Sequence, residues 1–182
     1  MLTITIPSIE GWDEETSEFV DVEPSVTIRL EHSLLSLSEW ESRWCKPLLT
    51  DQEKTEEELL DYIRCMALDK DLNPEVFNRL SPENVKEIYA YIYAPMTATT
   101  FRNDNTKKSG AKETITSELV YYWMVALQIP FECQRWHLNR LITLIRVCEV
   151  KNQPPKKMSK NDIMRRNAEL NAARRQKFNS KG

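Results

Sequence analysis

The side chains best suited to chemistry gather in one stretch, SELVYYWMVALQIPFECQRWHLNRLITLIRVC, at residues 117–148. Cys133 and His137 are four residues apart, and this spacing would place both on one face of a helix. A thiolate beside an imidazole could act as a nucleophile. The same pair could supply half of a metal site, with His32 and Cys45 as further ligands.

Three observations count against such a site. The chain has only two histidines, and its four cysteines follow no zinc-binding spacing. A cysteine without a partner packs as a small hydrophobic residue. We therefore expect Cys133 and His137 to belong to the core, and we expect no catalysis, no metal and no cofactor.

Aromatic residues in the same stretch could stack on bases or line a ligand pocket. They are Tyr121, Tyr122, Trp123 and Trp136. No arginines alternate with them in the first part of the stretch, and aromatic side chains contribute much of the burial energy of a core. We expect them to be core residues.

The charge is unevenly distributed. Residues 151–182 hold 10 basic and 2 acidic residues, a net charge of +8, whereas residues 1–150 hold 15 basic and 26 acidic residues, a net charge of −11. Residues 10–23 alone contain seven acids and no base, without the spacing of a calcium loop, and predict a solvated acidic face. The basic segment could bind an acidic protein surface, bind nucleic acid or remain solvated. The acidic body favours a protein partner over nucleic acid.

Local patterns predict the elements that would position these residues. Alternating apolar residues at 2–6, 18–22 and 25–30 predict a small antiparallel sheet of three strands. A helix is expected from about Ser33 to Pro47. Thr55, with Glu58 three residues later, predicts a capping box, and Ser81 followed by proline predicts another helix start. A polar loop is expected at 102–113.

Residues 116–150 predict a helical hairpin at the centre of the fold. Thr116 is a suitable N-cap, and residues 119–127 are apolar on every face, which predicts a helix buried nearly all round. A break at 128–130 and a second helix over about 131–150 would complete an antiparallel pair.

The predicted fold is mainly α (α+β). Residues 1–150 form one globular domain, with a β-rich part at 1–32 and a helical part at 33–150. Residues 151–182 form a basic linker, with two adjacent prolines, and an exposed helix capped by Ser159. The longest apolar run is nine residues, too short for a membrane helix of about 20. The first residues lack the features of a signal peptide, so we expect a cytoplasmic protein.

Four strings carry a resemblance to a known family: LEHSLLSLSEWESRW (30–44), APMTATTF (94–101), ITSELVYYWMVALQIPFECQRWHLNRLITLIRVC (115–148) and KMSKNDIMRRNAELNAARR (157–175). They resemble tail assembly chaperones of tailed bacteriophages. The resemblance implies a protein that acts in the host bacterial cytoplasm during tail assembly. It would bind the helical tape-measure protein until the tail tube subunits polymerise around it.

Two alternatives remain open: a structural component of the phage tail or neck, and a nucleic-acid-binding regulator that uses its basic tail. Self-association is also expected, because the acidic N-terminal segment and the basic tail could meet head to tail between copies. Residues expected to be exposed, and therefore expected to bind partners, are Trp12, Trp40, Trp44, Arg165, Arg166, Arg174 and Arg175.

Overall fold

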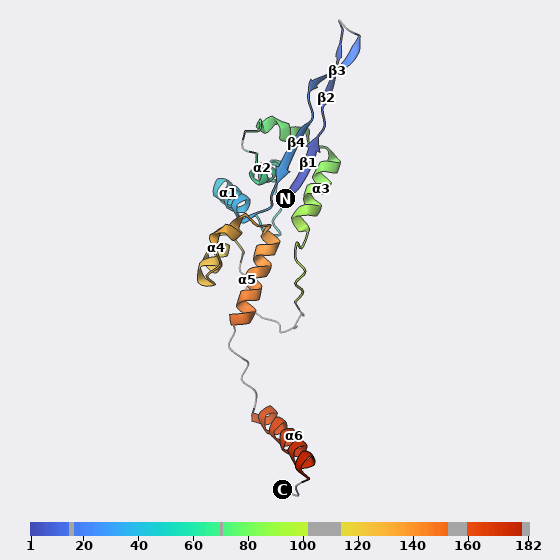
Figure 1. The fold of residues 1–182 in the computed structure, drawn as a ribbon. Coiled ribbons are helices and arrows are strands. Elements are labelled where there is room, and N and C mark those ends of the chain that lie inside the picture. Colours follow the sequence, from blue (N-terminus) through green and yellow to red (C-terminus); the bar gives the residue numbers. More distant parts are fainter. Residues whose placement is uncertain (15–16, 70, 102–113, 153–159, 180–182) are drawn as a thin grey trace. The chain divides into compact units, whose positions relative to one another are not determined.

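The computed structural model describes the 182 residues except 15–16, 70, 102–113, 153–159 and 180–182. The chain divides into two compact units, Met1–Glu149 and Val150–Gly182. The predicted mainly α fold with a small antiparallel β component is confirmed (Figure 1). Within the described ranges, no helix has the length and apolar character needed to cross a membrane.

The first unit begins with a two-stranded β-ribbon in two parts. β1 (Leu2–Ile6) pairs with β4 (Val26–Leu30), and β2 (Ile9–Asp13) pairs with β3 (Glu18–Glu23), both antiparallel. The prediction of three strands in one sheet is wrong, because β2 adds a fourth strand and the pairing breaks at two prolines, Pro7 and Pro24. Proline has no N–H to donate to a ladder. We call β2 and β3 together the arm.

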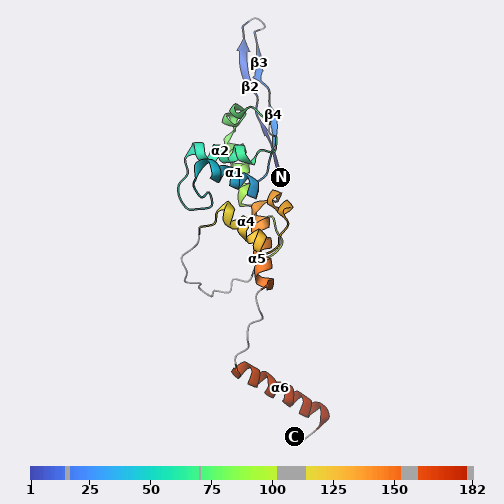
Figure 2. The same ribbon diagram turned by 90° about the vertical axis from the view of Figure 1, so that its left-hand side faces the viewer.

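The first core forms on one face of β1 and β4. Side chains alternate along both strands, so that Ile4, Ile6, Ile28 and Leu30 are buried and their neighbours face outward. Against them pack α2 (Glu56–Met66), η1 (Pro74–Arg79) and α3 (Pro82–Tyr93). Figure 2 shows α2 beside the ribbon.

The helix α1 (Leu34–Trp44) contributes to two cores. Trp40 packs in the first core, while Leu34 and Leu37 pack in a second core with α4 (Ser117–Ala126), η2 (Phe131–Arg135) and α5 (Leu138–Asn152). Its apolar residues are three apart, so successive ones progress around the helix and reach both cores. The two cores therefore meet at α1, and α4 and α5, the helices of the predicted 116–150 region, both pack in the second core.

The prediction of a single helix over 131–150 is also wrong, because residues 137–138 pair with residues 32–33. Residues 131–135 form a 3-10 helix, and Trp136 is extended. His137 forms an isolated β-bridge with Ser33, and the backbone N–H of Leu138 donates to the carbonyl of His32 at 2.7 Å. This pairing needs extended backbone, so the helix restarts only at Leu138.

The predicted helix starts are confirmed where the structure describes them. The hydroxyl oxygens of Thr55, Ser81 and Thr116 accept hydrogen bonds from the backbone N–H groups of Glu58, Asn84 and Leu119, at 3.2, 3.2 and 3.4 Å. The expected loop at 102–113, the proline linker and the Ser159 cap lie outside the described residues. In the second unit, α6 (Lys160–Phe178) has no buried residue.

Candidate interaction surfaces

The two histidines meet where the two cores join. His32 follows β4 and His137 precedes α5, and their ring centroids are 5.0 Å apart. His32 Nδ1 shares a hydrogen bond of 2.5 Å with the Tyr62 hydroxyl. His137 Nδ1 lies 3.3 Å from the backbone N–H of Asn139 and accepts from it, so His137 Nε2 carries the proton and donates to the Tyr91 carbonyl at 3.1 Å.

Burial keeps this pair uncharged. Removal from water is the larger cause, and the nearby His137 the smaller one, that together lower the pKa of His32 to about 3. Burial is also the main cause that lowers the pKa of His137 and raises the pKa of the Tyr62 hydroxyl. Two neutral imidazoles with satisfied hydrogen bonds are typical of a polar junction that joins two cores.

The cysteines do not join the histidines in a metal or nucleophilic site. Because η2 ends before Trp136, Cys133 and His137 do not share a helical face. Cys133 is buried in the second core, where burial raises the pKa of its thiol. Cys45 caps α1 at the opposite end of the helix from His32. Among the described residues, no three His, Cys, Asp or Glu side chains gather as metal ligands.

A cleft of about 500 Å³ opens beside the histidine pair. His32 and Tyr62 form part of its lining, together with Tyr89 and Tyr93 of α3 and residues 48–54. The ammonium of Lys54 donates to the carbonyls of Thr50 and Gln52 at 2.7 and 2.8 Å, which closes this turn on itself. The charge of Lys54 is therefore directed to its own turn, and the lining does not indicate a particular class of ligand.

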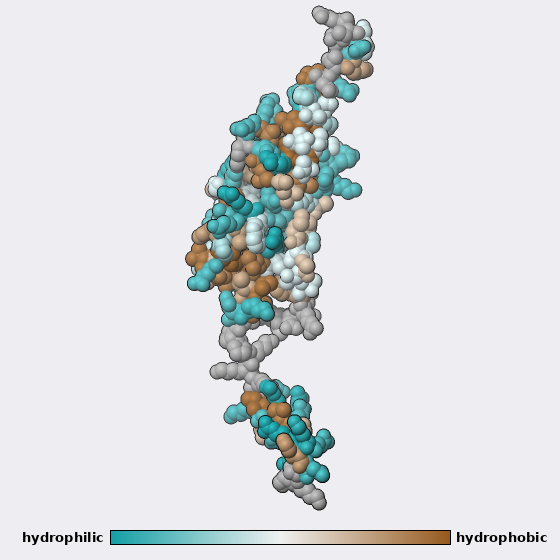
Figure 3. All heavy atoms as spheres, viewed as in Figure 1, coloured by the Kyte–Doolittle hydropathy of each residue, from teal (hydrophilic) through white to brown (hydrophobic). Residues whose placement is uncertain are grey.

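An apolar surface lies over α4 and η2. Tyr122, Val125 and Phe131 are 65%, 61% and 54% exposed, and we call these three residues the α4 surface. Tyr121 supports it from beneath, with its ring 6.4 Å from that of Phe131 and its hydroxyl bonded to the Gln134 amide oxygen at 3.1 Å. Figure 3 shows hydrophobic residues gathered over this part of the unit. The prediction that residues 119–127 are buried nearly all round is wrong, because only one side of α4, with Val120 and Met124, enters the core.

A second apolar surface lies on the arm. Trp12 and Phe19 are paired across β2 and β3, 56% and 69% exposed, with ring centroids 5.2 Å apart. Exposed glutamates flank them, which confirms a solvated acidic face for the described side chains. Phe19 was not among the predicted residues, although its aromatic type within an alternating strand is a readable signal.

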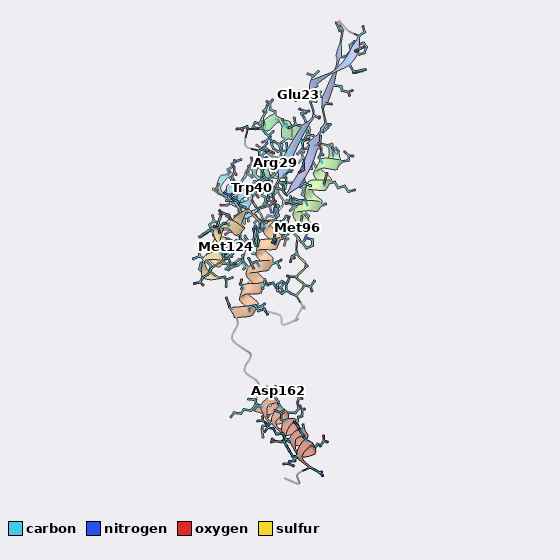
Figure 4. The ribbon with its side chains drawn as sticks, in the orientation of Figure 1. Glu23, Arg29, Trp40, Met96, Met124 and Asp162 are labelled. Carbon is cyan, nitrogen blue, oxygen red and sulfur yellow. The ribbon has the colours of Figure 1, made fainter. Side chains whose placement is uncertain are left out.

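Arg79 of η1 holds the base of the arm. Its guanidinium donates to the carbonyls of Pro7 and Pro24 at 2.5 and 2.9 Å and pairs with the carboxylate of Glu23 at 2.7 Å. Figure 4 shows Glu23 at this junction. One side chain, only 11% exposed, therefore contacts both sides of the ribbon at the point where its pairing is interrupted.

The predicted partner-binding residues have different environments. Trp12 is exposed, and so are the four arginines of α6, Arg165, Arg166, Arg174 and Arg175. Trp44 is half-buried, and its indole N–H donates to Asp61 at 2.9 Å. The expectation that Trp40 is exposed is wrong. It has no exposed surface, and its indole N–H donates to the Glu58 carbonyl at 2.7 Å.

Comparisons with protein-family models, with curated proteins and with solved structures found no match to this chain.

Proposed function

We propose that the chain is a non-catalytic tail assembly chaperone that binds a helical segment of the phage tape-measure protein. The observation that carries the proposal is the α4 surface, whose three large apolar side chains are exposed rather than buried. Exposed apolar groups of this kind mark surfaces for other proteins.

The geometry of the α4 surface suits a helical partner. Tyr122 and Val125 are three residues apart on one helix, so they form a ridge along α4, and Phe131 lies beyond its end. The apolar stripe of a second helix can pack against such a ridge. Full burial of each side chain contributes about 1.5–3 kcal/mol before the costs of association. A total of this size supports binding that can be reversed, as a chaperone requires.

The identity of the partner rests on the resemblance to phage tail assembly chaperones, which also places the protein in the host bacterial cytoplasm. The buried and neutral state of His32 and His137 supports a structural role for the residues that could otherwise do chemistry. The tail tube protein would displace the chaperone as it polymerises.

Co-expression with the tape-measure protein of the same phage tests the proposal. Tyr122→Ser combined with Val125→Ser should abolish co-purification and return the tape-measure protein to the insoluble fraction. The matched control is Tyr93→Ser, which removes a 78% exposed tyrosine from α3. This variant should still co-purify with the tape-measure protein and keep it soluble. Undiminished co-purification by a folded double variant would refute the proposal.

Purified phage particles distinguish a chaperone from a structural component of the tail or neck. Mass spectrometry of particles should find the tape-measure protein and no copy of this chain. A fixed number of copies per particle would favour the structural alternative.

A further inference from the structure

We infer that the arm of one copy is the docking surface for α6 of a second copy, so that the chain assembles head to tail. This inference is independent of the proposed function, because it uses neither the α4 surface nor the tape-measure protein. It identifies the residues through which copies of the chain contact one another.

Both surfaces carry an apolar stripe that the described residues of their own unit leave exposed. Trp12 and Phe19 lie on one face of the arm. In α6, Ile163, Leu170 and Phe178 are seven and eight residues apart, about two helical turns each, so they also lie on one face. No side chain of this 19-residue helix is buried, so packing within its own unit does not stabilise it and contact with another surface would.

The charges around the two stripes are opposite. Residues 9–23 contain seven acidic residues and no basic one, while residues 160–178 contain six basic and two acidic residues, which gives net charges of −7 and +4. Complementary charge around an apolar contact steers the two surfaces together and selects one pairing over others. The other exposed apolar surface, on α4, lacks an acidic run of this kind in its sequence.

The length of the chain favours a contact between copies over a contact within one. α5 starts at the base of the ribbon, where Leu138 bonds to His32, and runs away from the arm (Figures 1 and 2). Phe19 is separated from His32 by roughly 13 residues of ribbon, or about 40 Å. The seven residues between α5 and α6 span at most about 25 Å. Seven residues are therefore too few to bring the first turn of α6 to Phe19 of its own chain.

Such a contact joins two different surfaces, the arm of one copy and α6 of the next. A row of copies therefore ends with a free arm at one end and a free α6 at the other. Association of this type extends by addition of further copies unless the rotation between copies closes a ring. The chain should therefore form a concentration-dependent series of species, not a single dimer.

Charge reversal with complementation tests the inference on the full chain. One variant carries Glu10→Lys and Glu18→Lys on the arm, and another carries Arg174→Glu and Arg175→Glu on α6. Light scattering at about 50 mM salt should show a mass that rises with concentration for the wild type and the monomer mass for each variant alone. An equimolar mixture of the two variants should recover association, because each arm then faces an α6 of opposite charge.

The control variant, Glu83→Lys with Glu87→Lys on the exposed side of α3, should associate like the wild type. Roughly 1 M salt should weaken association of the wild type. A monomeric wild type at every concentration, or a mixture of variants that stays monomeric, would overturn the inference. Tyr122→Ser with Val125→Ser should leave self-association unchanged, so failure here and failure of the proposed function give different results.

Discussion

Individual residues of one type have very different roles in this chain. Trp12 and Trp40 are both followed by acidic residues, and the sequence around them does not separate an exposed indole from a buried one. The structure distinguishes the two indoles. Trp40 packs in the first core with the ribbon and α2, and its indole N–H donates to the Glu58 carbonyl. Burial of an indole depends on residues that pack around it from elsewhere in the chain.

Replacement of Trp40 should therefore destabilise the protein strongly. Trp40→Ala removes a fully buried side chain and should cost about 3–5 kcal/mol of unfolding free energy. Trp12→Ala should cost less than about 0.5 kcal/mol, because that indole is largely in solvent. Urea denaturation of the two variants measures both values, and equal losses would contradict the assigned environments.

His32 gives the protein a defined dependence on pH. Its folded-state pKa of about 3 lies below the ordinary value of 6.5, so the unfolded chain takes up a proton first as the pH falls. The contribution of neutral His32 to the free energy of unfolding is fully present above about pH 6.5. It decreases toward pH 3 by up to about 1.4 kcal/mol per pH unit. Between about pH 6.5 and 4.5 most carboxylates stay ionised, so the histidines dominate this loss.

His32→Gln should flatten this dependence while it keeps a hydrogen-bonding group beside Tyr62. The free energy of unfolding, measured at several pH values, should decrease less steeply in the variant than in the wild type. His137→Gln provides a second test, since burial also lowers the pKa of that imidazole. Identical slopes in all three proteins would show that neither histidine is neutral in the folded state.

The caps were predictable from the sequence and the histidine pair was not. A cap involves residues three apart, as Thr55 and Glu58 show, so the relevant partners are visible in a short window. His32 and His137 are brought together by the β-bridge between Ser33 and His137, which joins distant segments. No local pattern contains that information.

At the scale of elements, Glu41 connects α1 to the start of α4. Its carboxylate is buried and accepts hydrogen bonds from the backbone N–H groups of Ser117 at 2.7 Å and Leu48 at 3.1 Å. The first N–H groups of a helix have no partner within the helix, so a carboxylate there satisfies a donor and interacts favourably with the helix dipole.

Glu41→Ala should leave both backbone donors unpaired and cost about 2–6 kcal/mol, since each buried unsatisfied donor costs about 1–3 kcal/mol. Glu41→Gln retains one acceptor oxygen and should cost less. Glu87→Ala, at an exposed position on α3, is the control and should change stability little. Equal stability of the Ala and control variants in thermal or urea unfolding would show that Glu41 does not support α4.

The exposed side of α4 explains where hydropathy patterns fail. Residues 119–127 are apolar in every direction, and such a run is usually a buried helix. Here the side with Tyr122 and Val125 has no covering element within the described residues, so the same pattern marks a surface. Hydropathy records which side chains avoid water, but it does not record whether they are covered by the same chain or by another.

At the scale of the whole molecule, the second unit should add nothing to the stability of the first. No described residue of α6 is buried. A chain that ends at Asn152 keeps all of α5 and should unfold with a free energy within about 0.5 kcal/mol of the full chain at low protein concentration. Denaturation followed by circular dichroism measures this, and a larger loss would show that α6 stabilises its own first unit.

Arg79 gives the arm a property that neither strand has alone. Its guanidinium can hold the carbonyls of Pro7 and Pro24 only after η1 has settled against the ribbon, so the direction of the arm depends on completion of the first core. In the head-to-tail contact inferred above, Arg79 would therefore link the surface that meets a second copy to the folded core of its own unit.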